Sequence, residues 1–190
     1  MKKAILIIIS LLILSNVAWA QKAPDGFGGL KWGSSIEKLK EMVNIEPREI
    51  FDLPGGEKSA YFSAYDKLNM EKIGEAKVTY YSYSFSKSGK FYLARVDFPK
   101  DLNFDIFLKA LIMKYGNPKS MTPLVLKINP KARIGTEYTW IIENKVEINL
   151  SFNDMEQRGV NGMLSYLYLP IWREILKERE KDAVKTKDKL

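Results

Sequence analysis

The fold of this chain is decided by residues 77–98, which read KVTYYSYSFSKSGKFYLARVDF. Two runs rich in Tyr, Phe and Val flank Lys87-Ser88-Gly89-Lys90, and a polar tetrapeptide containing Gly is typical of a tight turn. Side chains alternate between the two faces of a strand. The stretch therefore predicts an antiparallel hairpin with strands over 77–85 and 91–98.

The register of this hairpin sorts its side chains onto two faces. Pairing across the turn places Phe85 opposite Tyr92, and each second residue along the strands then joins the same face. The predicted core face carries Thr79, Tyr81, Tyr83 and Phe85 opposite Phe98, Val96, Ala94 and Tyr92. The opposite face carries Tyr80, Ser82, Ser84, Phe91, Leu93 and Arg95.

Near the turn, this opposite face is unusually apolar for a solvated surface. Its aromatic, aliphatic and guanidinium groups have the composition favoured at the centre of protein–protein interfaces. Two interpretations remain open: the patch is a partner interface, or the C-terminal segment folds back and covers it through Trp172 and Ile175. The candidate interface residues are Tyr80, Phe91, Leu93 and Arg95.

A first helix is predicted to open at Trp32-Gly33-Ser34-Ser35. Ser34 and Glu37 have the spacing of a capping box. Serine hydroxyls and free N–H groups at a helix start can also hold an anion, but a capped helix with a packed Trp32 is the favoured interpretation. The apolar stripe at helical spacing is Ile36, Leu39, Met42 and Val43.

A second helix is predicted over 104–115. Asn103 is placed to cap its start, Gly116 to end it in a left-handed conformation, and Pro118 prevents its continuation. Its buried stripe is Phe104, Phe107, Leu108, Leu111 and Tyr115.

Alternating or β-rich runs predict further strands. A three-residue loop at Glu143-Asn144-Lys145 would place Tyr138 and Trp140 inside the core, and a two-residue loop would place them outside; the inside placement is favoured. Residues 170–190 predict a charged helix. The predicted strands are 49–53, 59–65, 124–128, 136–142, 146–152 and 163–169.

The order of elements is a helix followed by antiparallel strands, twice. We expect one α+β domain over 21–169, built from half-repeats of about 26–99 and 100–169 that form one sheet with helices on one face. The other face of the sheet is left open. Residues 170–190 follow as a charged C-terminal helix or tail.

The N-terminus has the pattern of a secretory leader. Lys2 and Lys3 precede an apolar run that ends in Ala18-Trp19-Ala20, which predicts a signal peptide over 1–20 cut after Ala20. The mature chain would begin at Gln21, so it lacks the N-terminal cysteine of a lipoprotein. We expect export to a periplasm or to the outside of the cell.

Composition excludes several kinds of site. The 190 residues include no His and no Cys, which rules out disulfides, Ser-His-Asp and Cys-His triads, and zinc sites of imidazole or thiolate. Paired carboxylates, Ser-Lys dyads and calcium sites are still allowed, but no motif for them or for a cofactor is found. We therefore predict no catalytic residue, no metal ligand and no cofactor.

The charge of the chain is moderately basic. Removal of the leader leaves 28 basic and 23 acidic residues, a formal charge of +5. The basic residues are spread along the chain, whereas nucleic-acid binders cluster them on one face or helix, so nucleic acid is not an expected partner. Weak contact with an anionic membrane surface is compatible with the charge.

Two short motifs and one tryptophan carry a resemblance to known proteins. Gly29-Leu30-Lys31-Trp32-Gly33-Ser34-Ser35-Ile36-Glu37, Lys114-Tyr115-Gly116-Asn117-Pro118 and Trp140 resemble small exported bacterial proteins of unassigned role. Their layout is similar to the β-lactamase-inhibitor-protein fold and to the small lipoproteins of the outer-membrane assembly machinery. The resemblance covers most of 26–169 and implies a tandem α/β repeat that binds other proteins.

Three functional classes follow from these observations. The first is an exported module that binds another envelope or secreted protein through the open sheet face. The second is an envelope-associated binder of anionic lipid or glycan, which rests on charge alone. The third, and the least supported, is a hydrolase that uses neither His nor Cys.

Overall fold

The computed structural model describes residues 22–43, 49–53, 55–63, 72–73, 76–99, 101–128, 131–155 and 160–187. The predicted leader and its cut after Ala20, the start of the mature chain at Gln21, and the predicted turn residue Pro54 lie outside these ranges. No helix within them is long and apolar enough to cross a membrane.

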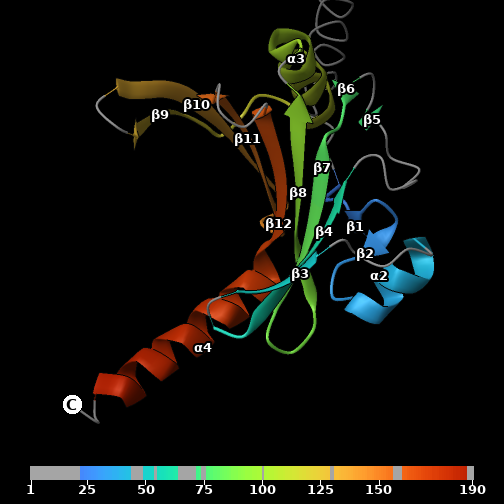
Figure 1. Cartoon of the computed structure of the whole chain (residues 1–190), viewed down its shortest axis with the longest axis vertical. Coiled ribbons are helices and arrows are strands. Elements are labelled where there is room, and N and C mark those ends of the chain that lie inside the picture. Colours follow the sequence, from blue (N-terminus) through green and yellow to red (C-terminus); the bar gives the residue numbers. More distant parts are fainter. Residues whose placement is uncertain are drawn as a thin grey trace, which may run out of the picture.

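Most of the described strands join one antiparallel sheet of eight, in the order β3-β4-β7-β8-β12-β11-β10-β9 (Figure 1). Two small two-stranded sheets, β1 with β2 and β5 with β6, lie outside it and were not predicted. The α+β class is confirmed. In the large sheet the strands are β3 (Glu49–Leu53), β4 (Glu57–Ser63), β7 (Tyr80–Phe85), β8 (Phe91–Pro99), β9 (Ser120–Ile128), β10 (Lys131–Ile142), β11 (Val146–Met155) and β12 (Val160–Tyr168). The small sheets are β1 (Gly26–Phe27), β2 (Leu30–Lys31), β5 (Lys72–Ile73) and β6 (Ala76–Lys77).

Three helices accompany the sheet in the described part of the chain: α2 (Ile36–Val43), α3 (Phe104–Tyr115) and α4 (Leu169–Lys187). Side chains of α2 and α3 join the main hydrophobic core, together with those on one face of the sheet. We call this the first face; it carries Tyr81, Tyr83 and Val96. The opposite face, which we call the second face, contacts α4. In Figure 1 this helix extends away from the lower end of the sheet.

The helix ends follow local sequence chemistry. Asn103 accepts a hydrogen bond from the Ile106 N–H at 3.2 Å, which confirms the predicted N-terminal cap of α3. Gly116 ends the helix as predicted, and its N–H donates to the Ile112 carbonyl at 2.8 Å, but its φ of 74° and ψ of −169° are not the predicted left-handed conformation. The cap of α2 was predicted one residue too early. Ser35, not Ser34, accepts from the Lys38 N–H at 3.3 Å.

The predicted helix stripes are partly confirmed. All five stripe residues of α3 belong to the main core or pack against it. In α2, Leu39 is fully buried and Ile36 packs on the core, but Met42 is 39% exposed. The side chain of Val43 lies outside the described set.

The Trp140 prediction is confirmed. Ile142 pairs with Val146 across a three-residue turn, and Glu143 and Asn144 adopt positive φ of 50° and 54°. This register places Trp140 opposite Ile148. The Trp140 side chain is 1% exposed, and its indole N–H donates to the Gly116 carbonyl at 2.8 Å.

The register of the central hairpin was correct over most of its length. Tyr81 pairs with Val96 and Tyr83 with Ala94, as predicted. Near the turn a bulge shifts the pairing, so that Phe85 lies opposite Phe91 instead of Tyr92.

The predicted exposure of Phe91 on the second face is therefore wrong. Phe91 is fully buried in the first-face core, where Trp32 stacks on it at a centroid distance of 4.8 Å. The physical reason is a backbone bridge to the start of α2: Gly33 N–H donates to the Phe91 carbonyl at 2.9 Å, and Phe91 N–H donates to the Ser34 carbonyl at 2.8 Å. Tyr92 is turned to the second face.

Candidate binding groove

Helix α4 docks on the second face through a small apolar cluster. Tyr92, Ile171 and Ile175 are each less than 7% exposed, and Leu93 and Trp172 pack against them. The Trp172 and Tyr92 rings stack at a centroid distance of 6.0 Å. The sequence left open whether this part of the sheet is a partner interface or is covered by the C-terminal segment. The structure shows that the C-terminal helix covers it.

A buried carboxylate also takes part in the contact between α4 and the sheet. Glu57, at the start of β4, is 3% exposed and accepts a hydrogen bond from the Tyr92 hydroxyl at 2.6 Å. Its other oxygen accepts from Arg179 of α4, whose guanidinium also lies 5.3 Å from the centre of the Trp172 ring. Bonds to an ionised group are about twice as strong as neutral ones, so Glu57 joins the sheet to the helix.

Burial and this bond also change the acidity of Tyr92. Loss of hydration, and then the hydrogen bond to the Glu57 carboxylate, raise the pKa of Tyr92 well above its ordinary value. Both causes favour the neutral phenol. Tyr92 therefore acts as a hydrogen-bond donor in this site and not as a base.

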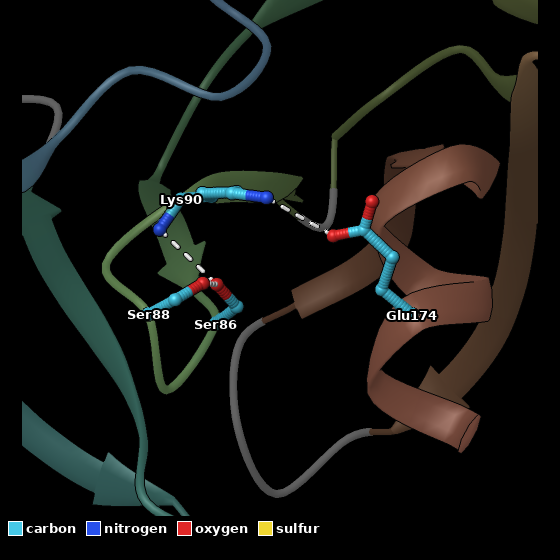
Figure 2. Close-up of polar contacts among 4 residues, drawn as sticks. All are labelled: Ser86, Ser88, Lys90 and Glu174. Atoms are coloured by element: carbon cyan, nitrogen blue, oxygen red, sulfur yellow. Dashed lines mark hydrogen bonds and ion pairs between the residues drawn. The ribbon is translucent and has the colours of Figure 1, made fainter. Parts of the chain in front are cut away.

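The turn between β7 and β8 contacts α4 at a second place (Figure 2). The Lys90 ammonium lies 3.1 Å from a Glu174 carboxylate oxygen, while the Lys90 backbone N–H donates to the Ser86 hydroxyl at 3.1 Å. The hydroxyls of Ser86 and Ser88 are 3.0 Å apart. Figure 2 shows the ammonium directed toward Glu174 and away from both serines, so these residues do not form a Ser-Lys dyad.

Beside this helix lies a groove with a volume of about 420 Å³. It crosses strands from β3 to β11 and is bounded by α4. Its middle is lined by leucine and tryptophan side chains, and its ends carry polar groups. The lining residues are Leu53, Glu57, Tyr92, Leu93, Asn149, Ser165, Leu167, Trp172 and Arg179.

Two of the four predicted interface residues lie on the second face outside the groove. Tyr80 stacks on Tyr61 of the neighbouring strand at 5.3 Å. Arg95 forms an ion pair with Asp97 at 2.9 Å, and half of its side chain remains exposed. Leu93 lines the groove, whereas Phe91 lies in the core. The structure does not bring the four together as one patch.

Sequence reasoning missed most of the groove. Tyr92 was assigned to the core because the bulge leaves no local mark in the sequence. Asn149 and Ser165 lie in two predicted strands and pair with each other. Alternation with their apolar neighbours in sequence is the signal that could have placed them on the second face. Nothing in the sequence pairs Glu57 with Arg179, which is 122 residues away.

The groove combines apolar surface with a few polar groups. Within the described residues, no group of three or more acidic side chains could hold a metal ion. Both oxygens of Glu57 are engaged by Tyr92 and Arg179. The groove thus offers apolar surface, an amide, a hydroxyl and a guanidinium to a ligand.

Comparison with known proteins gives little further information. No protein-family model matches the chain, and no curated protein matches it. Among solved structures, it is similar to a DUF4309 family protein (YjgB) from Bacillus subtilis subsp. subtilis str. 168. The two share 13% sequence identity over 82% of this chain and 93% of that chain, with a TM-score of 0.43. A likeness this distant does not assign a function.

Proposed function

We propose that this protein is an exported interaction module that binds another envelope or secreted protein through the second face of its sheet. Its leader over 1–20 would be cleaved after Ala20 and would deliver it to a periplasm or outside the cell. The observation that carries the proposal is the groove beside α4, whose apolar middle and polar ends match the make-up of a recognition site.

We propose in addition that the domain is a tandem repeat with halves of about 26–99 and 100–169. The strand order supports this, because β3, β4, β7 and β8 lie on one side of the β8–β12 junction and β9 to β12 on the other. Helices α2 and α3, one from each half, contribute to the same first-face core. This arrangement leaves the second face for α4 and a partner.

The experiment is affinity capture from an envelope extract with the chain produced from its full 190-residue sequence. Ser165→Trp fills the groove with a bulky side chain. Thr122→Trp is the matched control, because Thr122 is exposed at the β9 edge, three strands away in the sheet.

We expect a protein to be retained by the unmodified chain and by Thr122→Trp, and lost with Ser165→Trp. The proposal fails if all three retain the same proteins or if none retains any. Circular dichroism of each variant establishes that it is folded.

The alternative function is an envelope-associated binder of anionic lipid or glycan. It is favoured by a row of exposed basic residues along α4 at four-residue spacing: Arg173, Lys177, Lys181 and Lys185. A parallel row of Glu174, Glu178 and Asp182 reduces the local charge, and Lys185 lies 3.8 Å from Asp182.

Salt distinguishes this alternative from the proposed function. Binding through exposed charges weakens steeply between low and physiological ionic strength, whereas an apolar interface is much less sensitive. Co-sedimentation with vesicles of phosphatidylglycerol at several salt concentrations measures this directly. A hydrolase without His or Cys remains the third proposal, and the groove offers it no pair of unengaged carboxylates.

A further inference from the structure

We infer that the groove beside α4 takes a short peptide segment in which an apolar side chain stands within two residues of a carboxylate. This inference rests on the proposed function and specifies its ligand. It follows from three properties of the groove: its size, the distribution of polar groups along it, and the state of Arg179.

The size suits a side chain with its flanking backbone. A volume of about 420 Å³ lies toward the small end of ligand sites, which range from about 300 to 1,000 Å³. The middle is formed by Leu93, Leu167 and Trp172, which present apolar surface. A leucine- or phenylalanine-sized group buried there would be removed from water, which favours binding.

The polar end at β11 and β12 favours a peptide over an acyl chain. Asn149 and Ser165 carry an amide and a hydroxyl, which can bond the N–H and C=O groups of a backbone. Asn149 donates one amide hydrogen to Glu147 at 2.8 Å, which fixes the orientation of the amide. A hydrocarbon chain crossing this end would desolvate both groups without a bond in return, which is costly.

The other end carries the single cationic group among the lining residues, the Arg179 guanidinium. Arg179 bonds Glu57 through one of its terminal nitrogens, and its side chain is 44% exposed. A guanidinium carries five N–H donors in a rigid fork, so it can bond a second carboxylate while it holds the first. Stacking on Trp172 restrains the guanidinium in this position before a ligand arrives.

The test begins with a library of random heptapeptides displayed on phage and selected against the immobilised full chain. Selected peptides are then synthesised with a fluorescent label and titrated by fluorescence polarisation. We expect the selected sequences to share an apolar residue within two positions of Asp or Glu. Replacement of that acid by its amide should weaken binding about tenfold, because it removes the negative charge that pairs with Arg179 and keeps the size of the side chain.

The protein variants locate the binding site. Ser165→Trp should weaken binding of the selected peptides at least tenfold, and Thr122→Trp should leave it unchanged. If Ser165→Trp does not fold, Asn149→Trp blocks the same end of the groove from the neighbouring strand.

The outcomes separate this inference from the proposed function. Equal affinity for the acid and amide peptides overturns the ligand class, while a capture result that still depends on Ser165 leaves the proposed function standing. If the selected peptides bind Ser165→Trp as tightly as the unmodified chain, the groove is not their binding site. If the selected peptides are uniformly apolar, or if no peptide is selected, the inference is wrong. If affinity capture also fails, the proposed function is wrong as well.

Discussion

At the residue scale, two buried tyrosines of the same hairpin differ in the hydrogen bonding of their hydroxyl groups. The Tyr92 hydroxyl donates to the Glu57 carboxylate at 2.6 Å. The Tyr83 side chain is fully buried among aromatic rings, and no partner for its hydroxyl is found in the described part of the chain. A buried polar group without a partner carries its full desolvation cost.

Substitution of each tyrosine by phenylalanine should therefore change stability in opposite directions. We expect Tyr83→Phe to raise the free energy of unfolding by about 1 kcal/mol, because it removes only the unpaired hydroxyl. Tyr92→Phe should lower it by about 1.5 to 3 kcal/mol, because it removes a donor from a buried carboxylate. Urea denaturation at neutral pH measures both. A loss of stability in Tyr83→Phe would show that its hydroxyl has a partner.

Stability should also depend on alkaline pH. Burial is the first cause that raises the pKa of Tyr83, Tyr92 and Tyr166 in the folded protein; Tyr166 is also affected by its neighbour Tyr115. In the unfolded chain a tyrosine loses its proton near pH 10. Above that pH the unfolded state binds fewer protons than the folded state, so the free energy of unfolding falls as pH rises.

The measurement is the urea midpoint at a series of pH values from about 9 upward, read together with the ultraviolet absorbance of tyrosinate. We expect the midpoint to be flat below pH 10 and to fall above it. The fall should be shallower in Tyr83→Phe, which has one fewer such group. A midpoint that rises above pH 10 would contradict the direction of these shifts.

At the element scale, the contacts of α4 differ greatly in strength. Trp172 packs on Tyr92 and Arg179 at the boundary between helix and sheet. The Lys90–Glu174 pair is about half exposed on both sides, and such surface pairs contribute about 0 to 1 kcal/mol. The apolar contact, not the ion pair, should hold the helix in place.

We predict that Trp172→Ala lowers the free energy of unfolding by about 2 kcal/mol and exposes α4, whereas Lys90→Ala changes it by less than about 1 kcal/mol. Limited trypsin digestion reports the helix directly, because Arg173 and Lys177 lie within it. Cleavage there should accelerate in Trp172→Ala and stay unchanged in Lys90→Ala. Equally faster cleavage in both variants would mean that the Lys90–Glu174 ion pair contributes as much as Trp172 to the docking of α4.

The elements that the sequence could predict are those specified by neighbouring residues. Asn103 and Gly116 mark the ends of α3 through local hydrogen bonds, and the strand 49–53 was predicted with its observed bounds. Phe91 could not be placed, because its orientation depends on backbone bonds to Gly33 and Ser34, almost 60 residues earlier. The groove depends on the same shift, which turns Tyr92 toward α4.

At the scale of the whole molecule, the two halves of the sheet meet at β8 and β12. These strands pair over most of their length, with Val96 opposite Leu164 and Ala94 opposite Tyr166. Each also pairs with a strand of its own half, β7 or β11. Side chains of both halves therefore share one core, which favours a single cooperative unit.

Hydrogen exchange tests whether the molecule opens as this unit. We expect the amides of β8 and β12 to exchange only through global unfolding, because they lie in the middle of the sheet. Amides of β9, the edge strand, and of α4 beyond Arg179, where the described side chains are exposed, should exchange through local opening at free energies lower by about 2 kcal/mol or more. Exchange of β3 to β8 and of β9 to β12 at two separate free energies would instead mean that each half folds on its own, with β8 and β12 joining two preformed units.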